Sequence, residues 1–188
     1  MKSEKNCLVT GGAKRIGRSI CTELAKDGWN VVIHYNKSEH ESKILVNEIK
    51  KLGKYSIKVQ ADFNTFTVDQ SFSSFMEKIE KEIGPLSLLV NNAAVFNYDS
   101  PNSVSTSQMK FHLSNNLIVP VMLAKALYQN RVKDISKGQT TVVINLLDQK
   151  LWNPNPDFFS YTLSKSALNE ATKLMARAFA PQLRVLGV

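Results

Sequence analysis

Apolar residues along this chain gather in six short runs, and longer stretches with helix-like patterning separate them. The short runs cover residues 6–10, 30–35, 56–62, 86–92, 140–148 and 184–188, and the longer stretches lie near 15–27, 39–53, 67–83, 106–133 and 160–180. Near-continuous apolar runs of this length are typical of strands buried on both faces. Their alternation with helices predicts a doubly wound parallel sheet covered by helices on both faces, in a single α/β domain over residues 1–188.

The turn after the first run has the composition of a phosphate-binding loop. Ligands bind doubly wound sheets beyond the carboxyl ends of the strands, and here TGGAKRIG, residues 10–17, follows the first strand and opens a helix. Glycines at such a turn let backbone N–H groups approach a phosphate. Gly11 and Gly17 lie six positions apart, one more than the outer glycines of GxGxxG. This spacing indicates a slightly wide, Rossmann-type cofactor turn, and a tight turn without a ligand is the alternative.

The end of the second run indicates which nucleotide is bound. NAD-binding folds place an Asp or Glu about 20 residues past the glycines to hold the ribose 2′-hydroxyl, but this chain has HYNKS there, residues 34–38. Lys37 and Ser38, with Arg15 from the first turn, could instead hold a 2′-phosphate. Charge-assisted hydrogen bonds are each worth about 1.5–3 kcal/mol, so two would favour NADPH over NADH about a hundredfold or more. We therefore expect NADP(H).

The fifth helical stretch begins with YTLSK, which carries the candidate acid chemistry. Tyr161 and Lys165 are four residues apart and share one face of the predicted helix. A tyrosine can donate a proton to a carbonyl oxygen when a nearby ammonium stabilises its phenolate.

Together, TGGAKRIG, NNAA, YTLSK and RVLGV, in this order along the whole chain, resemble a short-chain dehydrogenase/reductase. The resemblance implies hydride transfer between a nicotinamide and the carbonyl or imine of a small-molecule substrate. Tyr161 would be the proton donor, and Lys165 would hold the nicotinamide ribose and lower the tyrosine pKa. The implied cofactor-binding residues are Gly11, Arg15, Ile16, Gly17, Tyr35, Asn36, Lys37, Ser38, Asp62, Phe63, Asn92, Ala93, Ala94, Tyr161 and Lys165.

Two departures from the common family pattern point to a branch of it. Asp148 stands where most members have a serine at the end of the fifth strand, and Arg15 replaces a glycine of the first turn. Both are shared by the pteridine reductase branch, which also favours a stretch like HYNKS and places an aromatic ring on the pterin where Phe96 stands. A carboxylate at 148 could accept hydrogen bonds from pterin amino and ring N–H groups or relay protons. The alternatives are that Asp148 caps the next segment and that Phe96 is core packing.

Asn116 is a further catalytic candidate in the long fourth helical stretch. Pro120 lacks the N–H that would bond the carbonyl of residue 116, so this helix is expected to be interrupted there. The resemblance implies that the freed carbonyl holds a water that leads protons towards Lys165. A kink without catalytic purpose is the alternative.

Composition and charge change this picture little. The chain has 188 residues and a net charge of +8, but its lysines are scattered over predicted helix surfaces, which favours a solvated basic surface over nucleic-acid binding. Cys7 and Cys21 show no metal-ligand spacing and fit reduced thiols. No apolar run approaches the ~20 residues of a membrane span, and the charged start MKSEKN contains no signal-peptide core. We expect a cytoplasmic protein that does not bind membranes, nucleic acid or metal.

Two other functions remain open from the sequence. One is a 3-oxoacyl-thioester reductase of the same fold, although Asp148 counts against it. The other is a non-enzymatic cofactor- or nucleic-acid-binding protein. The resemblance also implies a homo-oligomer, either a dimer or a tetramer. The family normally continues beyond RVLGV, so the C-terminal part of the fold is expected to be missing. His40 and His112 lie on predicted helices with no acidic partner visible in the sequence.

Overall fold

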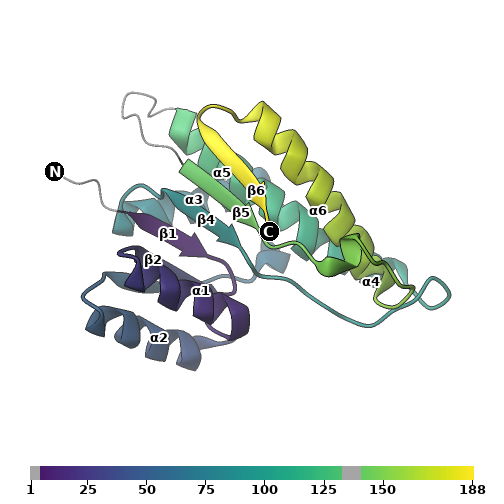
Figure 1. Ribbon diagram of the computed structural model, residues 1–188, viewed down its shortest axis with the longest axis horizontal. Helices are drawn as coiled ribbons and strands as arrows, with labels where there is room; N and C mark the ends of the chain where they lie inside the picture. The colour runs from purple at the N-terminus through teal and green to yellow at the C-terminus, as the bar shows by residue number, and fades with distance from the viewer. Residues whose placement is uncertain (1–4, 133–140) are drawn as a thin grey trace.

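Six strands form one parallel sheet in the order β3-β2-β1-β4-β5-β6, as the computed structural model shows for residues 5–132 and 141–188 (Figure 1). The strands are β1 (Asn6–Val9), β2 (Asn30–Tyr35), β3 (Ser56–Gln60), β4 (Leu88–Asn91), β5 (Thr141–Asn145) and β6 (Leu183–Gly187). The order reverses between β1 and β4, which pair in register from Cys7 opposite Leu88 to Val9 opposite Val90. The predicted doubly wound sheet is confirmed.

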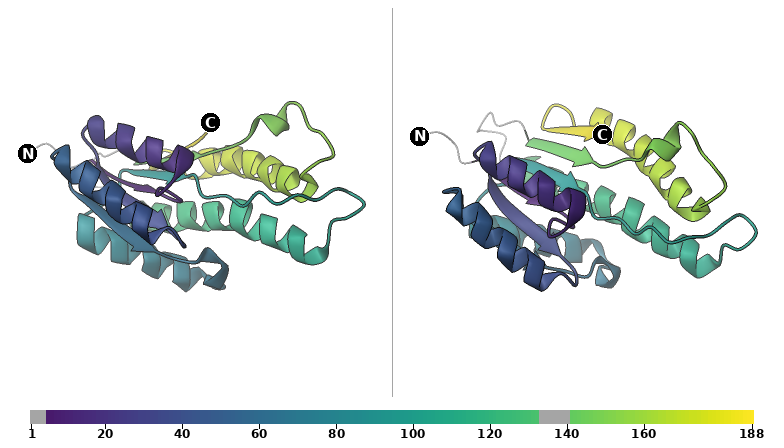
Figure 2. Two further views of the ribbon diagram at one scale, coloured as in Figure 1. Left: turned by 90° about the horizontal axis from the view of Figure 1, so that it is seen from below. Right: turned by 60° about the horizontal axis from the view of Figure 1, so that its bottom comes forward.

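Helices cover both faces of the sheet, so successive strand residues are buried on alternate sides (Figures 1 and 2). On one face α1 (Arg15–Lys26) and α2 (Glu39–Lys51) pack against residues such as Val9, Val31 and Ile33. On the other face α3 (Asp69–Ile83), α5 (Val119–Val132) and α6 (Phe159–Ala178) pack against residues such as Leu8 and Leu89. The two apolar layers hold the strand ends rigidly, and the loops beyond those ends form the site.

The helix expected over residues 106–133 is divided. Helix α4 (Thr106–Leu113) is followed by one π-helical turn, Ser114–Ile118, before α5 begins at Val119, and residue 133 lies outside the described residues. The π turn ends two residues before Pro120, which has no N–H to continue the regular ladder. The predicted interruption is therefore confirmed, and it takes the form of a widened turn that contains Asn116.

The strands end earlier than the apolar runs predicted. β3 ends at Gln60 and β5 at Asn145, while short 3₁₀ turns form at Phe63–Thr65 and Gln149–Leu151. An aspartate precedes each turn, and its carboxylate accepts a backbone N–H two residues further on. Such local hydrogen bonds compete with the strand ladder, so the chain leaves the sheet and exposes its polar residues at the carboxyl edge.

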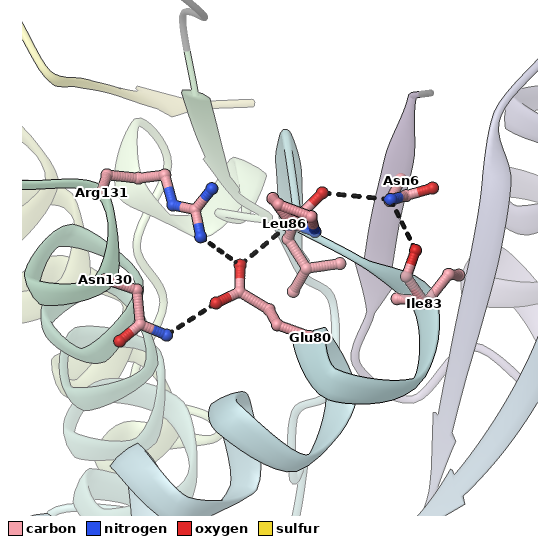
Figure 3. A network of polar contacts seen from close by, with 7 residues as sticks. Asn6, Glu80, Ile83, Leu86, Asn130 and Arg131 are labelled. Carbon is pink, nitrogen blue, oxygen red and sulfur yellow. Dashed lines mark hydrogen bonds and ion pairs between the residues drawn. The ribbon is translucent and has the colours of Figure 1, made fainter. Parts of the chain in front are cut away.

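Near the amino ends of the strands, opposite the carboxyl edge, the carboxylate of Glu80 joins α3 to α5 (Figure 3). Glu80 accepts hydrogen bonds from the Leu86 backbone N–H at 2.9 Å, from Asn130 Nδ2 at 2.7 Å and from Arg131 Nη2 at 2.6 Å. Beside it, Asn6 Nδ2 donates to the carbonyl of Ile83 at 2.8 Å. The network fixes the connection between α3 and β4 from both sides.

Cys7 in β1 and Cys21 in α1 are free, buried thiols. Burial raises the pKa of both, to about 12 for Cys21. Within residues 5–132 and 141–188, no helix combines the length and the apolar character that crossing a membrane requires.

Candidate active site

The loops after β4 and β5 extend beyond the carboxyl edge on the same side of the molecule and meet the start of α6 (Figure 2). There Tyr161 Oη donates a hydrogen bond of 2.6 Å to Asp148 Oδ2. The other oxygen, Oδ1, accepts the Lys150 backbone N–H at 2.9 Å. Asp148 thus caps the next segment, as one interpretation held, and also contacts the candidate proton donor. Its contact with a pterin stays a prediction.

Lys165 lies one turn after Tyr161 on α6 and is almost completely buried, with 4% of its surface exposed. Its ammonium donates to the carbonyl of Leu146 at 2.6 Å and stands 5.9 Å from the centre of the Tyr161 ring. Burial lowers the pKa of Lys165 to about 8, while the charge of Asp148 acts in the opposite direction. The charge of Asp148 therefore offsets only part of the cost of burying the ammonium.

The pKa of Tyr161 differs from what the family resemblance implied. Burial first, and then the hydrogen bond and charge of Asp148, raise this pKa above the ordinary tyrosine value. The Lys165 ammonium donates to the Leu146 carbonyl, and its charge does not cancel the effects of burial and of Asp148. The geometry consequently keeps the Tyr161 hydroxyl protonated, which is the state that a proton donor needs.

Asn116 contacts the site through its side chain. Its Oδ1 accepts the Val95 N–H at 2.9 Å, and its Nδ2 donates to the Val95 carbonyl and to Ser164 Oγ, both at 3.0 Å. This residue therefore joins the loop after β4 to α6. The role predicted for its backbone carbonyl stays a prediction.

Phe96 forms an aromatic wall beside the proton donor. Its ring lies edge-on to Tyr161, with ring centres 4.6 Å apart, and stacks on Phe158 at 3.9 Å. About half of the Phe96 surface is exposed, at 52%. Simple core packing does not leave a large ring so open, so this placement favours a binding surface over the packing interpretation.

The glycine-rich turn is tightly packed against the loop after β4. A Cβ on Gly17 would lie 2.3 Å from the Gly11 carbonyl oxygen and 2.5 Å from Asn92 Nδ2, and Gly11 itself has φ +62°. The Asn92 side chain donates to the carbonyls of Thr10 and Gly11 at 2.8 and 3.1 Å. The Thr10 hydroxyl accepts the N–H groups of Asn92 and Ala93, both at 3.0 Å. These contacts fit a backbone cradle for a pyrophosphate, because only glycine allows so close an approach.

The N-terminus of α1 is cationic and open. Its first turn contains no acidic residue and no side chain caps it, while Arg15 and Ile16 are exposed beside Gly17. Arg15 has φ +49°, a left-handed conformation that favours glycine. The exposure of a cation at this strained position fits an anionic ligand.

The end of β2 offers no free carboxylate to a ribose. Lys37 is exposed there and Ser38 precedes α2. The two nearby acids are already paired, Glu39 with Lys58 and Glu41 with Lys14, each at 2.7 Å. Tyr35 is buried, and its hydroxyl accepts from Lys58 at 3.2 Å.

A pocket of about 140 Å³ lies between the loops after β2, β3 and β4. It brings together five of the predicted cofactor residues: Asn36, Asp62, Phe63, Ala93 and Ala94. Asp62 Oδ1 accepts from the backbone and side chain of Asn64 at 3.0 and 2.7 Å, which lowers the Asp62 pKa. A carboxylate kept ionised in this pocket fits the amino group of an adenine.

The sequence did not predict the contacts of two histidines. His112 is buried beside Ser160, which in turn donates to Asp99, so an acidic residue that the sequence did not reveal lies one hydrogen bond beyond its partner. His34 is buried between the glycine-rich turn and Ala61, and burial lowers its pKa to about 4. The partners are far apart in sequence, and no periodic pattern marks them.

Comparisons with known proteins identify relatives of this chain. The sequence profile of the short chain dehydrogenase family matches residues 5–188. The chain is similar to FolM alternative dihydrofolate reductase 1 from Brucella suis in complex with NADP, with 39% identity and a TM-score of 0.87 over 97% of this chain and 73% of that chain. The Brucella canis protein, also complexed with NADP, has 38% identity and a TM-score of 0.87 over 97% of this chain and 71% of that one.

A relative with lower sequence identity is named for a different substrate. The 3-oxoacyl-(acyl-carrier-protein) reductase FabG from Staphylococcus aureus is 28% identical over 183 residues, which cover 96% of this chain and 70% of the relative.

Proposed function

Because this chain belongs to the short-chain dehydrogenase family, we propose that it is an NADPH-dependent reductase whose substrate is a pterin-type heterocycle. The observation that carries the proposal is the contact of Tyr161 with Asp148 beside the exposed ring of Phe96. The FolM relatives support the substrate class, because dihydrofolate contains a pterin ring and these proteins are dihydrofolate reductases by name.

The choice of NADPH rests on the first turn and the end of β2. Arg15 and Lys37 are exposed cations, and the acids of α2 are held by other lysines. The glycine cradle would hold the pyrophosphate, and the pocket with Asp62 would hold the adenine. Both FolM relatives were solved with NADP, which supports the same preference.

The residues of the site have separate roles in the reduction of a C=N or C=O bond. Reduced nicotinamide supplies a hydride to the carbon, and the Tyr161 hydroxyl supplies a proton to the nitrogen or oxygen. Asp148 accepts from Tyr161 and can also accept from ring N–H or amino groups of a heterocycle. The nearby Lys165 ammonium stabilises the phenolate that remains after the proton has left.

The test is NADPH oxidation by the purified protein with dihydropterins, quinonoid pterins and acetoacetyl thioesters, with NADH in parallel. Turnover of a pterin with NADPH is expected, and Tyr161→Phe should lower it by about 100-fold or more because the proton donor is lost. Tyr55→Phe is the matched control, since Tyr55 is exposed at the start of β3, away from the site.

A thioester reductase is the second candidate, favoured by the similarity to FabG over 96% of the chain. Turnover of the thioester alone would replace the pterin substrate by this one and keep the roles of Tyr161 and Lys165. Undiminished turnover in Tyr161→Phe would contradict the assignment of the proton donor.

A further inference from the structure

A second polar cluster is buried directly behind the substrate side of the site. It consists of Asp99, His112 and Ser160, which are 1%, 0% and 0% exposed and come from the loop after β4, from α4 and from α6. Ser160 Oγ lies 2.5 Å from His112 Nδ1 and donates a short hydrogen bond to Asp99 Oδ2. Asp99 Oδ1 also accepts the Ser160 backbone N–H at 3.0 Å.

The contacts of His112 fix the position of its proton. The backbone N–H of Asn97 donates to His112 Nε2 at 3.1 Å, so Nε2 carries a lone pair. The proton of the neutral ring must then be on Nδ1, which donates to Ser160 Oγ. Hydrogen bonds therefore run in one direction, from Asn97 through His112 and Ser160 to the Asp99 carboxylate.

This order of residues excludes a nucleophilic serine. In a catalytic triad the imidazole lies between the carboxylate and the hydroxyl and accepts the hydroxyl proton. Here the serine lies in the middle and donates to Asp99, and all three residues are shielded from solvent. The cluster can therefore influence the reaction only through the residues that adjoin it in the sequence.

Those neighbours are the two groups that would hold and protonate the substrate. Asn97 follows Phe96, the aromatic wall, and Ser160 precedes Tyr161, the proton donor. The chain from Asn97 to Asp99 thus locks the wall and the donor in one arrangement, with their rings 4.6 Å apart and at 84°.

We propose that His112 is a positioning residue for substrate binding, which holds Phe96 against Tyr161 through Asn97, Ser160 and Asp99, and which does so only as the neutral Nδ1–H tautomer. The part of this proposal that concerns substrate rests on the proposed function. The tautomer and the fixed loop do not depend on it.

The proposal makes substrate binding sensitive to acid. Two titratable groups face His112, namely Asp99 from the loop after β4 and Tyr161 from α6, whose ring centre is 6.2 Å away, while the π turn contributes none. Burial lowers the His112 pKa and Asp99 opposes this. Protonation would place a hydrogen on Nε2 against the Asn97 N–H, so the loop is released when the pH falls below that pKa.

The direct test is the imidazole ¹⁵N spectrum of the protein, which distinguishes the two neutral tautomers. His112 should carry its proton on Nδ1. His34 is an internal reference for the opposite state, because its Nδ1 accepts from Gly11 and its Nε2 donates to Ala61. Signals are assigned with His40→Gln, since His40 is the exposed third histidine, and with His112→Gln, which removes the signals of His112 itself. A proton on Nε2 of His112 would overturn the proposal without any measurement of activity.

The functional test compares Ser160→Ala with Ser160→Thr, which restores the hydroxyl, and with Ser166→Ala, an exposed serine on the same helix. Ser160→Ala should raise the KM for the heterocycle about tenfold and leave the KM for NADPH within about twofold, because one charge-assisted link is lost on the substrate side only. It should also speed amide exchange at Asn97 by about tenfold or more.

Three outcomes separate the possibilities. Equal rises in both KM values, or unchanged exchange at Asn97, would show that the cluster only stabilises the fold. An acid-induced rise in the substrate KM that persists in His112→Gln would assign the pH effect to another group. If no heterocycle is turned over by the unaltered protein, the proposed function fails, and the tautomer and the exchange at Asn97 still decide whether His112 fixes the loop.

Discussion

At the scale of single residues, Asp148 shows how one side chain serves both fold and chemistry. Its Oδ1 caps the turn that begins at Gln149, and its Oδ2 accepts from Tyr161. The capping contact holds the carboxylate in the orientation that the second contact needs. A serine at this position has one oxygen and could not make both contacts with the same geometry.

The lowered pKa of Lys165, about 8, predicts opposite effects of alkaline pH on stability and on turnover. The folded state binds this proton less tightly than the unfolded state, so the cost of burying the ammonium is present at neutral pH. That cost decreases as the pH rises from about 8 towards the ordinary lysine value. Between about pH 7 and about pH 9.5, this residue should raise the melting temperature while turnover falls with loss of its charge.

Thermal unfolding of the protein and of Lys165→Met over this pH range isolates the contribution. Lys165→Met should be more stable at neutral pH by about 1 kcal/mol, because a buried charge is replaced by an apolar group of similar size. Its melting temperature should lack the alkaline gain. Parallel pH profiles for the two proteins would contradict the assignment.

Arg15 is expected to affect both cofactor preference and the stability of the fold. Because it is left-handed at φ +49°, Arg15→Gly should stabilise the fold by about 1 kcal/mol. The same change should weaken NADPH binding about tenfold or more, with little effect on NADH, because a cation for the 2′-phosphate is lost.

Binding titrations with both nucleotides and a thermal melt measure these effects together. Lys26→Ala is the control for net charge, since it removes a cation from the last turn of the same helix. Equal weakening of NADPH and NADH would show that Arg15 contacts the shared part of the cofactor.

At the scale of helices and strands, stability depends on contacts that lie far from the site. Glu80 and Arg131 have only 13% of their side chains exposed, so their ion pair is shielded from water. Glu80 also accepts the Leu86 N–H, two residues before β4 begins. A single carboxylate therefore joins α3, α5 and the chain that leads into the sheet.

Glu80→Gln should lower the free energy of unfolding by about 1–3 kcal/mol, because the Arg131 guanidinium loses its charged partner. NADPH affinity should not change, since Glu80 lies at the edge of the sheet opposite the glycine-rich turn. Denaturant unfolding and a cofactor titration test the two statements. Glu82→Gln, an exposed residue of the same helix, is the control, and a similar loss in that variant would assign the effect to the charge of α3 as a whole.

At the scale of the whole molecule, the fold could be predicted because its pattern is periodic. Buried strands and amphipathic helices leave regular signals, so the order of elements and the carboxyl-edge site followed from the sequence. Tyr161 and Asp148 were each singled out in the sequence, but their hydrogen bond to each other was not predicted. The raised pKa of Tyr161 did not follow from the sequence, because it depends on the burial of the phenol and on its hydrogen bond to Asp148.

The buried histidines mark the limit of sequence interpretation. His112 reaches Ser160 across 48 positions, and His34 reaches Ala61 across 27. No helix or strand periodicity relates the two residues of either pair, so their separation in the sequence does not predict the contact. Only the packed loops decide which nitrogen accepts and which donates.

The reversal of strand order between β1 and β4 affects how the two specificities of the protein can evolve. The turn, Arg15 and the end of β2 lie on one side of this seam, while Asp148, Tyr161 and Lys165 lie on the other. Thr10 and Asn92 join the two sides, because the side chain of each forms a hydrogen bond with the backbone of the other. Nucleotide choice and substrate choice can therefore evolve as separate traits, and recombination at this seam would shuffle them without rebuilding the enzyme.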